Sequence, residues 1–237
     1  MRQAGGMTTA DGWMATVRSR IGLGRLIALG DAADGAWIAE RAADAVLRRA
    51  ARRVPGVEPG RLRIALAGAE SATVPAFPAP PGSVPPGPLR VEAEFAAGYG
   101  VPLPDLTERV RTALFTAAER RLGLAVAEVD LRVTALLDAP PDSPATPAPP
   151  SEDPATTPDD PADDPAAVAA AAVPGVARLT AVLGPSVHRA ADHLRIELAT
   201  APDHRALDVA RAVRGAVEGA GKGALPVTVL VTEVLES

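Results

Sequence analysis

The tetrapeptide Val-Pro-Gly-Val occurs twice in this chain, at residues 54–57 (VPGV) and at residues 173–176 (VPGV). The stretch before the first copy, residues 37–53 (WIAERAADAVLRRAARR), repeats apolar side chains at helical spacing and predicts an amphipathic helix. Asp34 lies just before this stretch and is a candidate N-cap. The apolar face of the predicted helix consists of Ile38, Ala42, Ala45 and Val46. The tetrapeptide therefore marks the point where a helix gives way to the next element.

Three strands and a second helix are predicted after the first tetrapeptide. They are a strand at residues 62–66, a strand at 89–95, a helix at 104–122 and a strand at 126–135. Apolar side chains alternate in each strand segment, as in half-buried strands, whereas the helical segment has apolar residues three and four apart. Asp105 or Thr107 lies near the start of this helix and Gly123 at its end. The order α-β-β-α-β describes a small α+β module.

The same order of motifs recurs in the second half of the chain. Four segments have counterparts there: 54–57 and 173–176, 89–92 and 194–197, 110–114 and 213–217, and 131–137 and 229–235. Repeated motifs in one order indicate an internal duplication. The second copy is shorter, because its first helix covers only residues 166–172 and it has no proline-rich excursion. We therefore expect two α-β-β-α-β modules, each a short sheet packed against helices.

Two proline-rich segments interrupt the chain, of which residues 139–165 form the boundary between the modules and residues 71–88 lie inside the first module. Residues 139–165 contain ten prolines and seven acidic residues but no Lys or Arg, so we expect a disordered linker there. Residues 71–88 contain seven prolines and predict a long surface excursion between two strands. Its one aromatic residue, Phe77, can dock this excursion onto the rest of the protein. The expected domains are an N-terminal segment at 1–30 with a short amphipathic helix, a first module at 31–138 and a second module at 166–237.

Composition excludes several classes of function. The chain has no cysteine, which excludes disulfides, thiol nucleophiles and thiolate metal sites. Residues 1–138 hold 17 Arg against 15 acidic residues, and residues 166–237 hold seven basic and seven acidic residues, so neither module is strongly basic. Nucleic-acid binding is therefore not expected. The first 20 residues lack the apolar core of a secretory signal, and no apolar run is long enough to span a bilayer. We therefore expect a cytoplasmic protein, with the inner face of the membrane as an alternative location.

Motifs for catalysis, metals and cofactors are not found. The three histidines, His188, His193 and His204, have a spacing that matches no ligand motif. Residues 219–223 (GAGKG) lack the upstream glycine and the Ser or Thr of a phosphate-binding loop, and no serine lies in a G-x-S-x-G motif. Glu92 and Glu94 lie on one strand face, where they are expected to be exposed partners of arginine. The sequence predicts a protein that is not an enzyme and carries no cofactor or metal.

The first module resembles the alkaline-shock family of envelope stress response proteins of Gram-positive bacteria. The resemblance rests on the helix that leads into residues 54–57 (VPGV), on residues 91–100 (VEAEFAAGYG), on V-R-x-A-L at residues 110–114 and on residues 123–133 (GLAVAEVDLRV). It covers residues 37–138, and residues 166–237 more loosely. The resemblance implies a small α+β domain that acts without catalysis and assembles at the cytoplasmic face of the membrane through a membrane-anchored partner.

Two surfaces are candidates for interaction with a partner. The predicted first helix concentrates arginines that suit an acidic surface, namely Arg41, Arg48, Arg49, Arg52 and Arg53. The N-terminal segment repeats Trp13, Val17 and Ile21 every four residues and suits a membrane surface or a partner. For both surfaces a purely structural role, as a solvated helix face or as packing against the protein itself, remains an alternative.

The sequence favours a non-catalytic scaffold or adaptor that associates with itself or with a protein partner. This partner is either soluble or anchored in the membrane. An exposed strand edge in an open three-stranded sheet is a template for such association. The alternative is a regulatory protein that binds a small ligand or nucleic acid in an apolar or basic pocket between the two modules.

Overall fold

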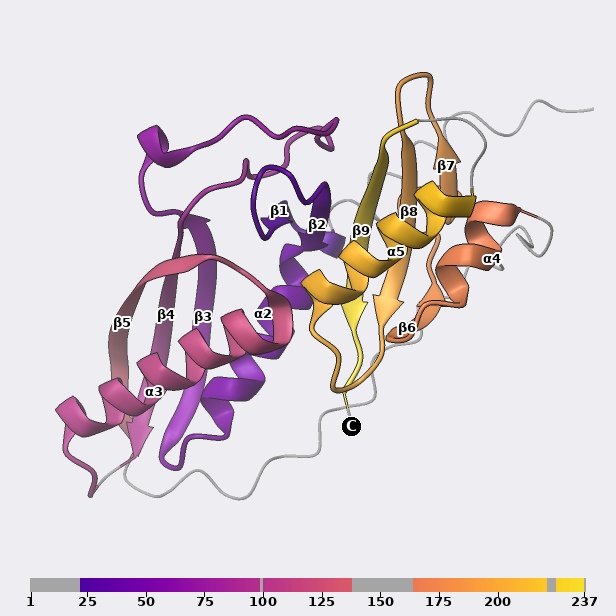
Figure 1. Cartoon of the computed structure of the whole chain (residues 1–237). Helices are drawn as coiled ribbons and strands as arrows, with labels where there is room; N and C mark the ends of the chain where they lie inside the picture. The colour runs from indigo at the N-terminus through magenta and orange to yellow at the C-terminus, as the bar shows by residue number, and fades with distance from the viewer. Residues whose placement is uncertain (1–21, 99, 138–163, 221–224, 237) are drawn as a thin grey trace, which may run out of the picture.

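The computed structural model describes residues 22–98, 100–137, 164–220 and 225–236, and these residues form an α+β fold with two β-sheets (Figure 1). The expected fold class is thereby confirmed. The predicted interaction residues Trp13, Val17 and Ile21 lie outside the described residues, as does the linker up to residue 163. The last residue of the predicted linker, Pro165, begins a helix instead, because Asp164 caps it by accepting a hydrogen bond from the Ala166 N–H at 2.9 Å.

The first sheet has three strands in the order β3-β4-β5. The strands are β3 (Val57–Leu66), β4 (Leu89–Gly98) and β5 (Val126–Leu137). β3 is antiparallel to β4, and β5 is parallel to β4. One face of this sheet is covered by α2 (Glu40–Arg52) and α3 (Leu103–Ala117), the latter continued by the π-helix η2 (Ala118–Leu122). The predicted elements of the first module are therefore present and in the predicted order.

The second sheet has six strands in the order β1-β2-β9-β8-β6, with β7 also paired to β8. Its strands are β1 (Leu26–Leu29), β2 (Ala36–Ala39), β6 (Val176–Leu179), β7 (Val187–Arg189), β8 (Leu194–Thr200) and β9 (Val227–Val234). The helices α4 (Pro165–Ala171) and α5 (Ala206–Ala220) lie on one face. The strands β1 and β2 come from the first half of the chain. The sheet of the second module is therefore completed by residues predicted to belong to the N-terminal segment, in β1, and to the first module, in β2.

The prediction of a helix from Trp37 onward was wrong at its start. Residues 36–39 form β2, which pairs in parallel with β9 through Trp37 opposite Leu230 and Ile38 opposite Val231. The helix α2 begins at Glu40 with Ala39 as its N-cap, and Asp34 does not cap it. Ala45 is exposed, and the buried face consists of Ala42, Ala43, Val46, Leu47 and Ala51. Strand pairing with a distant segment has overridden the helical periodicity of the local sequence.

The helix α3 begins at Leu103, one residue before the predicted start, and Asp105 and Thr107 lie in its first turns as expected. Its N-cap is Pro102, without a side-chain hydrogen bond. Gly123 does end the helical segment, with φ of +86° in the left-handed region. A Cβ atom at this position would lie 2.4 Å from the Cβ of Leu207, so glycine is required both by the backbone and by the close approach of α5.

The two modules share their strand pairing in detail. The Gly98 N–H donates to the Gly56 carbonyl at 2.7 Å, and in the second module the Ala201 N–H donates to the Gly175 carbonyl at 2.7 Å. A register shift follows Phe95 where β4 pairs with β5, and a corresponding shift follows Leu198 where β8 pairs with β9. In this register β9 repeats β5 and β8 repeats β4, while β6 and β7 together take the place of β3.

This register corrects one of the sequence matches. Leu131 lies opposite Ala93 in the first sheet, and Val229 lies opposite Ile196 in the second. Because residues 131–137 correspond to 229–235, residues 194–197 correspond to 91–94, and not to 89–92 as the similarity of Leu-Arg-Val-Glu to Leu-Arg-Ile-Glu indicated. Glu197 is thus the counterpart of Glu94.

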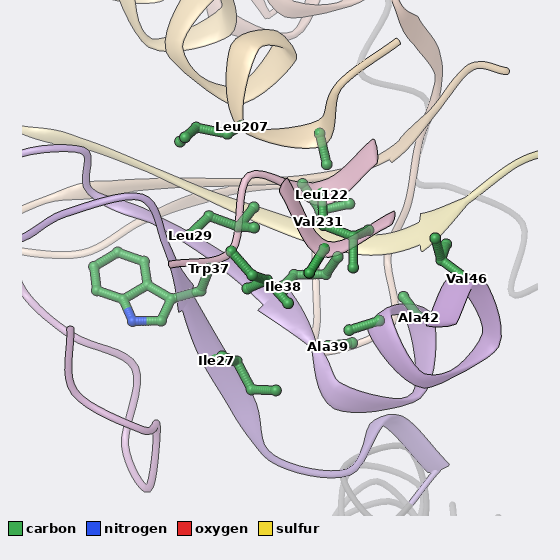
Figure 2. Close-up of a cluster of buried hydrophobic side chains, with 14 of the residues drawn as sticks. Ile27, Leu29, Trp37, Ile38, Ala39, Ala42, Val46, Leu122, Leu207 and Val231 are labelled. Carbon is green, nitrogen blue, oxygen red and sulfur yellow. The ribbon is translucent and has the colours of Figure 1, made fainter. Parts of the chain in front are cut away.

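The two modules share one hydrophobic core. Figure 2 shows Leu122 of η2 and Leu207 of α5 close to Ile38 of β2 and Val231 of β9. These four side chains are 3% exposed or less. Side chains from both halves of the chain therefore exclude water from the same space, which joins the modules through hydrophobic burial.

An ion pair between a buried aspartate and an exposed arginine adds to this junction. Asp34, 7% exposed, accepts hydrogen bonds from Arg211 of α5 at 2.6 Å to Oδ1 and 2.9 Å to Oδ2. Burial acts to raise the pKa of Asp34, but the hydrogen bonds from Arg211 and from the Asp31 N–H and the charges of Arg211 and Arg214 outweigh it, so the pKa lies below its ordinary value. The residue proposed as a helix cap therefore links the modules.

The proline-rich excursion at residues 71–88 docks onto the second module. Phe77 lies beneath the guanidinium of Arg214, whose central carbon is 4.1 Å from the ring centroid. The Ala76 N–H donates to the Ala32 carbonyl at 2.8 Å, and the Val84 N–H donates to the Leu26 carbonyl at 2.7 Å. The excursion is therefore held along the outer side of β1.

Candidate functional site

The arginines of α2 do not form one free surface. Arg48 pairs with Asp44 at 2.6 Å and donates to the Gly60 carbonyl of β3, and Arg49 pairs with Glu236 near the end of the second module. Arg41, Arg52 and Arg53 are exposed, and Arg41 donates to the Gly22 carbonyl at 3.3 Å. Two of the five predicted interaction residues thus act in internal packing, which reduces the positive surface available to a partner.

Arg49 also lies among other positive charges. Its pKa is lowered by burial first, and then by the charges of Arg53, Arg52 and Arg121. Arg121 pairs with Asp203 of the second module at 3.1 Å. Arg49, Arg53 and Arg121 line a small cavity of about 100 Å³ between the modules together with Asp203 and Glu236, which makes this cluster part of their junction.

Two of the three histidines lie together at a larger cavity. A cavity of about 340 Å³ is bounded by residues 78–82 of the excursion, by residues 23–26 and by His188, His193 and Arg195 of the β7–β8 hairpin. Burial lowers the pKa of His188, helped by the charges of Arg195 and His193. His204 lies elsewhere, and no cluster of three His, Asp or Glu side chains suited to a metal ion occurs within the described residues.

Beside this cavity a carboxyl group is fully buried. Glu197 is 0% exposed, its Oε2 accepts hydrogen bonds from the Val182 and Leu183 N–H groups at 3.0 Å, and its Oε1 lies 2.8 Å from Arg195. Burial raises the pKa of Glu197, and these partners offset the effect only in part. The sequence did not reveal this residue, because strand alternation places it on an outward face that the loop at residues 180–186 covers.

The outer edge of β3 is closed by side chains. Arg25 and Glu40 form an ion pair at 2.7 Å, and Arg25 also donates to the Ile64 carbonyl. Burial acts to raise the pKa of Glu40, but hydrogen bonds from Arg25 and from the Ile64 N–H lower it below its ordinary value. Arg25 thus satisfies the carbonyl of Ile64, and Arg48 does the same for the carbonyl of Gly60. Such side chains prevent a further strand from adding to this edge.

The edges of the second sheet are short or covered. β2 fills the side of β9 that faces away from β8. The outer side of β1 meets Val84 of the excursion, which forms a bridge with Ile27. The other end of the sheet consists of β6 and β7, of four and three residues. Neither end offers a long template for strand addition.

The edge of β5 is different. This strand of 12 residues lies at the end of the first sheet, and no strand within the described residues pairs with its outer side. Along it Glu128, Asp130 and Arg132 are exposed on the face away from the helices, while Leu131 and Val133 are half-buried on the other face. Leu136, near the end of the strand, is 63% exposed. β5 is thus the long open edge of the described structure.

The sheet face away from α2 and α3 is open and carries alternating charges. Arg90 of β4 pairs with Glu128 at 2.6 Å and with Asp130 at 3.5 Å, and Arg132 lies 3.7 Å from Glu94. The hydrogen bond to Glu128 raises the pKa of Arg90. The charged side chains on this face thus pair mostly with one another, which leaves the edge of β5 as the candidate site.

No protein-family model matches the chain, and neither a curated protein nor a solved structure does. Among the described residues, every helix is too short or too polar to cross a membrane.

Proposed function

We propose that the protein is a non-catalytic scaffold or adaptor, and that its binding site is the outer edge of β5, which takes up an extended strand from a protein. Strand addition uses backbone hydrogen bonds for affinity and alternating side chains for specificity. The resemblance to the alkaline-shock family, whose members act without catalysis, is in agreement with this role.

One observation carries the proposal. In the second module the strand that corresponds to β5 is β9, and its outer edge is filled by β2 at Val229, Leu230 and Val231. The corresponding residues of β5 are Leu131, Arg132 and Val133, and there the edge is open. The chain itself thus provides an example of a strand added at this position of the module.

The proposal is tested by photocrosslinking from two positions of the first sheet. A photoreactive amino acid replaces Arg132 on β5 or Arg63 on β3, both of which are exposed. We expect covalent adducts with a protein in the native host from position 132, and few from position 63, because Arg63 lies on the closed edge. Equal labelling from both positions, or none from position 132, would contradict the proposal.

A second candidate function is the binding of a small ligand in the cavity of about 340 Å³ between residues 78–82 and the β7–β8 hairpin. This cavity combines proline and leucine side chains with His188, His193 and Arg195, as the ligand-binding alternative requires. If this cavity binds a ligand, the ligand should raise the melting temperature of the wild-type protein and leave that of a His188→Ala variant unchanged. If a screen of small molecules finds no such ligand, ligand binding is refuted and the strand-binding proposal is unaffected.

A further inference from the structure

We propose that the strand taken up by β5 is the β5 of a second copy of this chain, paired antiparallel with Leu131 on the twofold axis. This inference rests on the proposed function and specifies the partner. It predicts a symmetric dimer in which two three-stranded sheets join into one continuous sheet of six strands, with the helices of both copies on the same face.

The side chains of β5 are complementary to themselves in this register. With Leu131 opposite its own copy, Asp130 faces Arg132 of the second copy, and the twofold axis generates the same pair again. On the helix face, Val129 lies opposite Val133 of the second copy. Directly opposite residues of antiparallel strands interact most strongly, and opposite charges and apolar pairs both stabilise the pairing.

The neighbouring registers are less favourable. A shift that places Asp130 or Arg132 on the axis brings like charges into direct opposition. A shift that places the axis between Leu131 and Asp130 or between Leu131 and Arg132 sets Leu131 against a charged side chain. It also puts the helices of the two copies on opposite faces of the joined sheet, because side chains alternate with a period of two. The register centred on Leu131 has neither fault.

The backbone of β5 suits this contact. Its pairing with β4 is regular from Glu128 to Val133, between two register shifts. Leu131 lies within this straight segment, so the residues that would face each other stand on undistorted strand. The existing ion pairs there, Asp130 with Arg90 at 3.5 Å and Arg132 with Glu94 at 3.7 Å, are long and exposed, so exchanging them for pairs across the dimer costs little.

The absence of cysteine from the chain allows a direct test of the register. Opposite residues of antiparallel strands have Cα atoms about 4.5–5.5 Å apart, within the range that a disulfide spans. We expect the full-length Leu131→Cys variant to form a covalent dimer on mild oxidation. Asp130→Cys and Arg132→Cys are expected to crosslink poorly alone and efficiently when mixed. Leu62→Cys, half-buried on β3, is the matched control and should stay uncrosslinked.

A charge exchange keeps the test independent of Leu131. Sedimentation equilibrium of the wild-type protein is expected to show a reversible dimer, and Asp130→Arg or Arg132→Asp to weaken it by about tenfold, because each substitution sets like charges against each other twice. The double variant Asp130→Arg/Arg132→Asp restores opposite charges and should recover the wild-type dissociation constant.

Three outcomes overturn the inference: a strictly monomeric wild-type protein, a dimer that crosslinks through position 62, or a double variant as weak as the single ones. The proposed function is judged separately. If the crosslink from position 132 captures a different protein and the purified chain stays monomeric, strand binding at β5 stands and the second copy is wrong as its partner.

Discussion

The two sheets of this protein are built on the same module, yet one is closed and the other is open. In the second sheet, Thr228, Leu230 and Thr232 of β9 are buried on the face away from α5, and β2 covers the edge of that strand. In the first sheet, the corresponding face carries exposed charges and the edge of β5 has no neighbouring strand within the described residues. The same module can therefore be closed in one copy and leave a strand edge open in the other.

The largest effect is expected where the first half of the chain completes the second sheet. Trp37 of β2 is 2% exposed, and Trp37→Ala should lower the free energy of unfolding by about 3–5 kcal/mol, because it removes a large buried side chain. Because the modules share one core, we expect a single unfolding transition in urea, shifted to lower concentration. Two separate transitions, with only one of them shifted, would show that the sheets are independent.

A smaller effect is expected at the ion pair between the modules. Arg211→Ala leaves the Asp34 carboxylate nearly buried without its main partner and should cost about 1–3 kcal/mol of stability. The loss should shrink as the pH falls through the lowered pKa of Asp34, because the protonated group no longer needs the arginine. Arg178→Ala, which breaks the exposed pair with Glu233, is the control and should change stability by less than about 1 kcal/mol. Equal losses of unfolding free energy in the two variants would contradict the claim that the ion pair between Asp34 and Arg211 stabilises the contact between the modules.

The buried carboxylate of the second sheet, Glu197, should make the stability of the protein depend on pH. The pKa of Glu197 is raised by burial, so its contribution to stability is fully present below its ordinary value and is lost as the pH rises through the raised value. We therefore expect the wild-type protein to lose stability relative to Glu197→Gln as the pH increases from about 4.5. Asp34 and Glu40, whose pKa values are lowered, are present in both proteins. Their pH-dependent contributions therefore cancel in the difference in stability between the two proteins. Parallel pH profiles from denaturant titrations would refute this assignment.

The smallest effect is expected at the counterpart of Glu197 in the open sheet. Glu94→Gln weakens only an exposed pair with Arg132 at 3.7 Å, so the free energy of unfolding should change by less than about 0.5 kcal/mol. A loss as large as that of a core substitution would mean that the face of the first sheet is covered.

Local periodicity was sufficient to predict most of the elements. The alternation in residues 89–95 and 126–135 predicted β4 and β5, and the helical spacing in residues 104–122 predicted α3 with η2. β2 was missed because its four residues lead directly into α2 and keep the same apolar spacing. What makes them a strand is pairing with β9, far away in the sequence, which no local pattern reveals.

The candidate site could be predicted only in part. The sequence indicated that an open three-stranded sheet offers strand edges, but not which edge stays open. The closure of β3 depends on Arg25 and Arg48, whose contacts with Ile64 and Gly60 arise only when the chain is folded. For the same reason the arginines of α2 were grouped as one surface, although Arg48 and Arg49 are held by neighbours within the protein.

Amide hydrogen exchange at two protein concentrations tests the central claim most directly. The account predicts that, among residues 128–133 of β5, the amides that point away from β4 exchange quickly in dilute protein and become protected as the concentration rises. The amides of residues 229–231 of β9 that point toward β2 are protected at both concentrations. Protection of both strands that is equal and independent of concentration would contradict it.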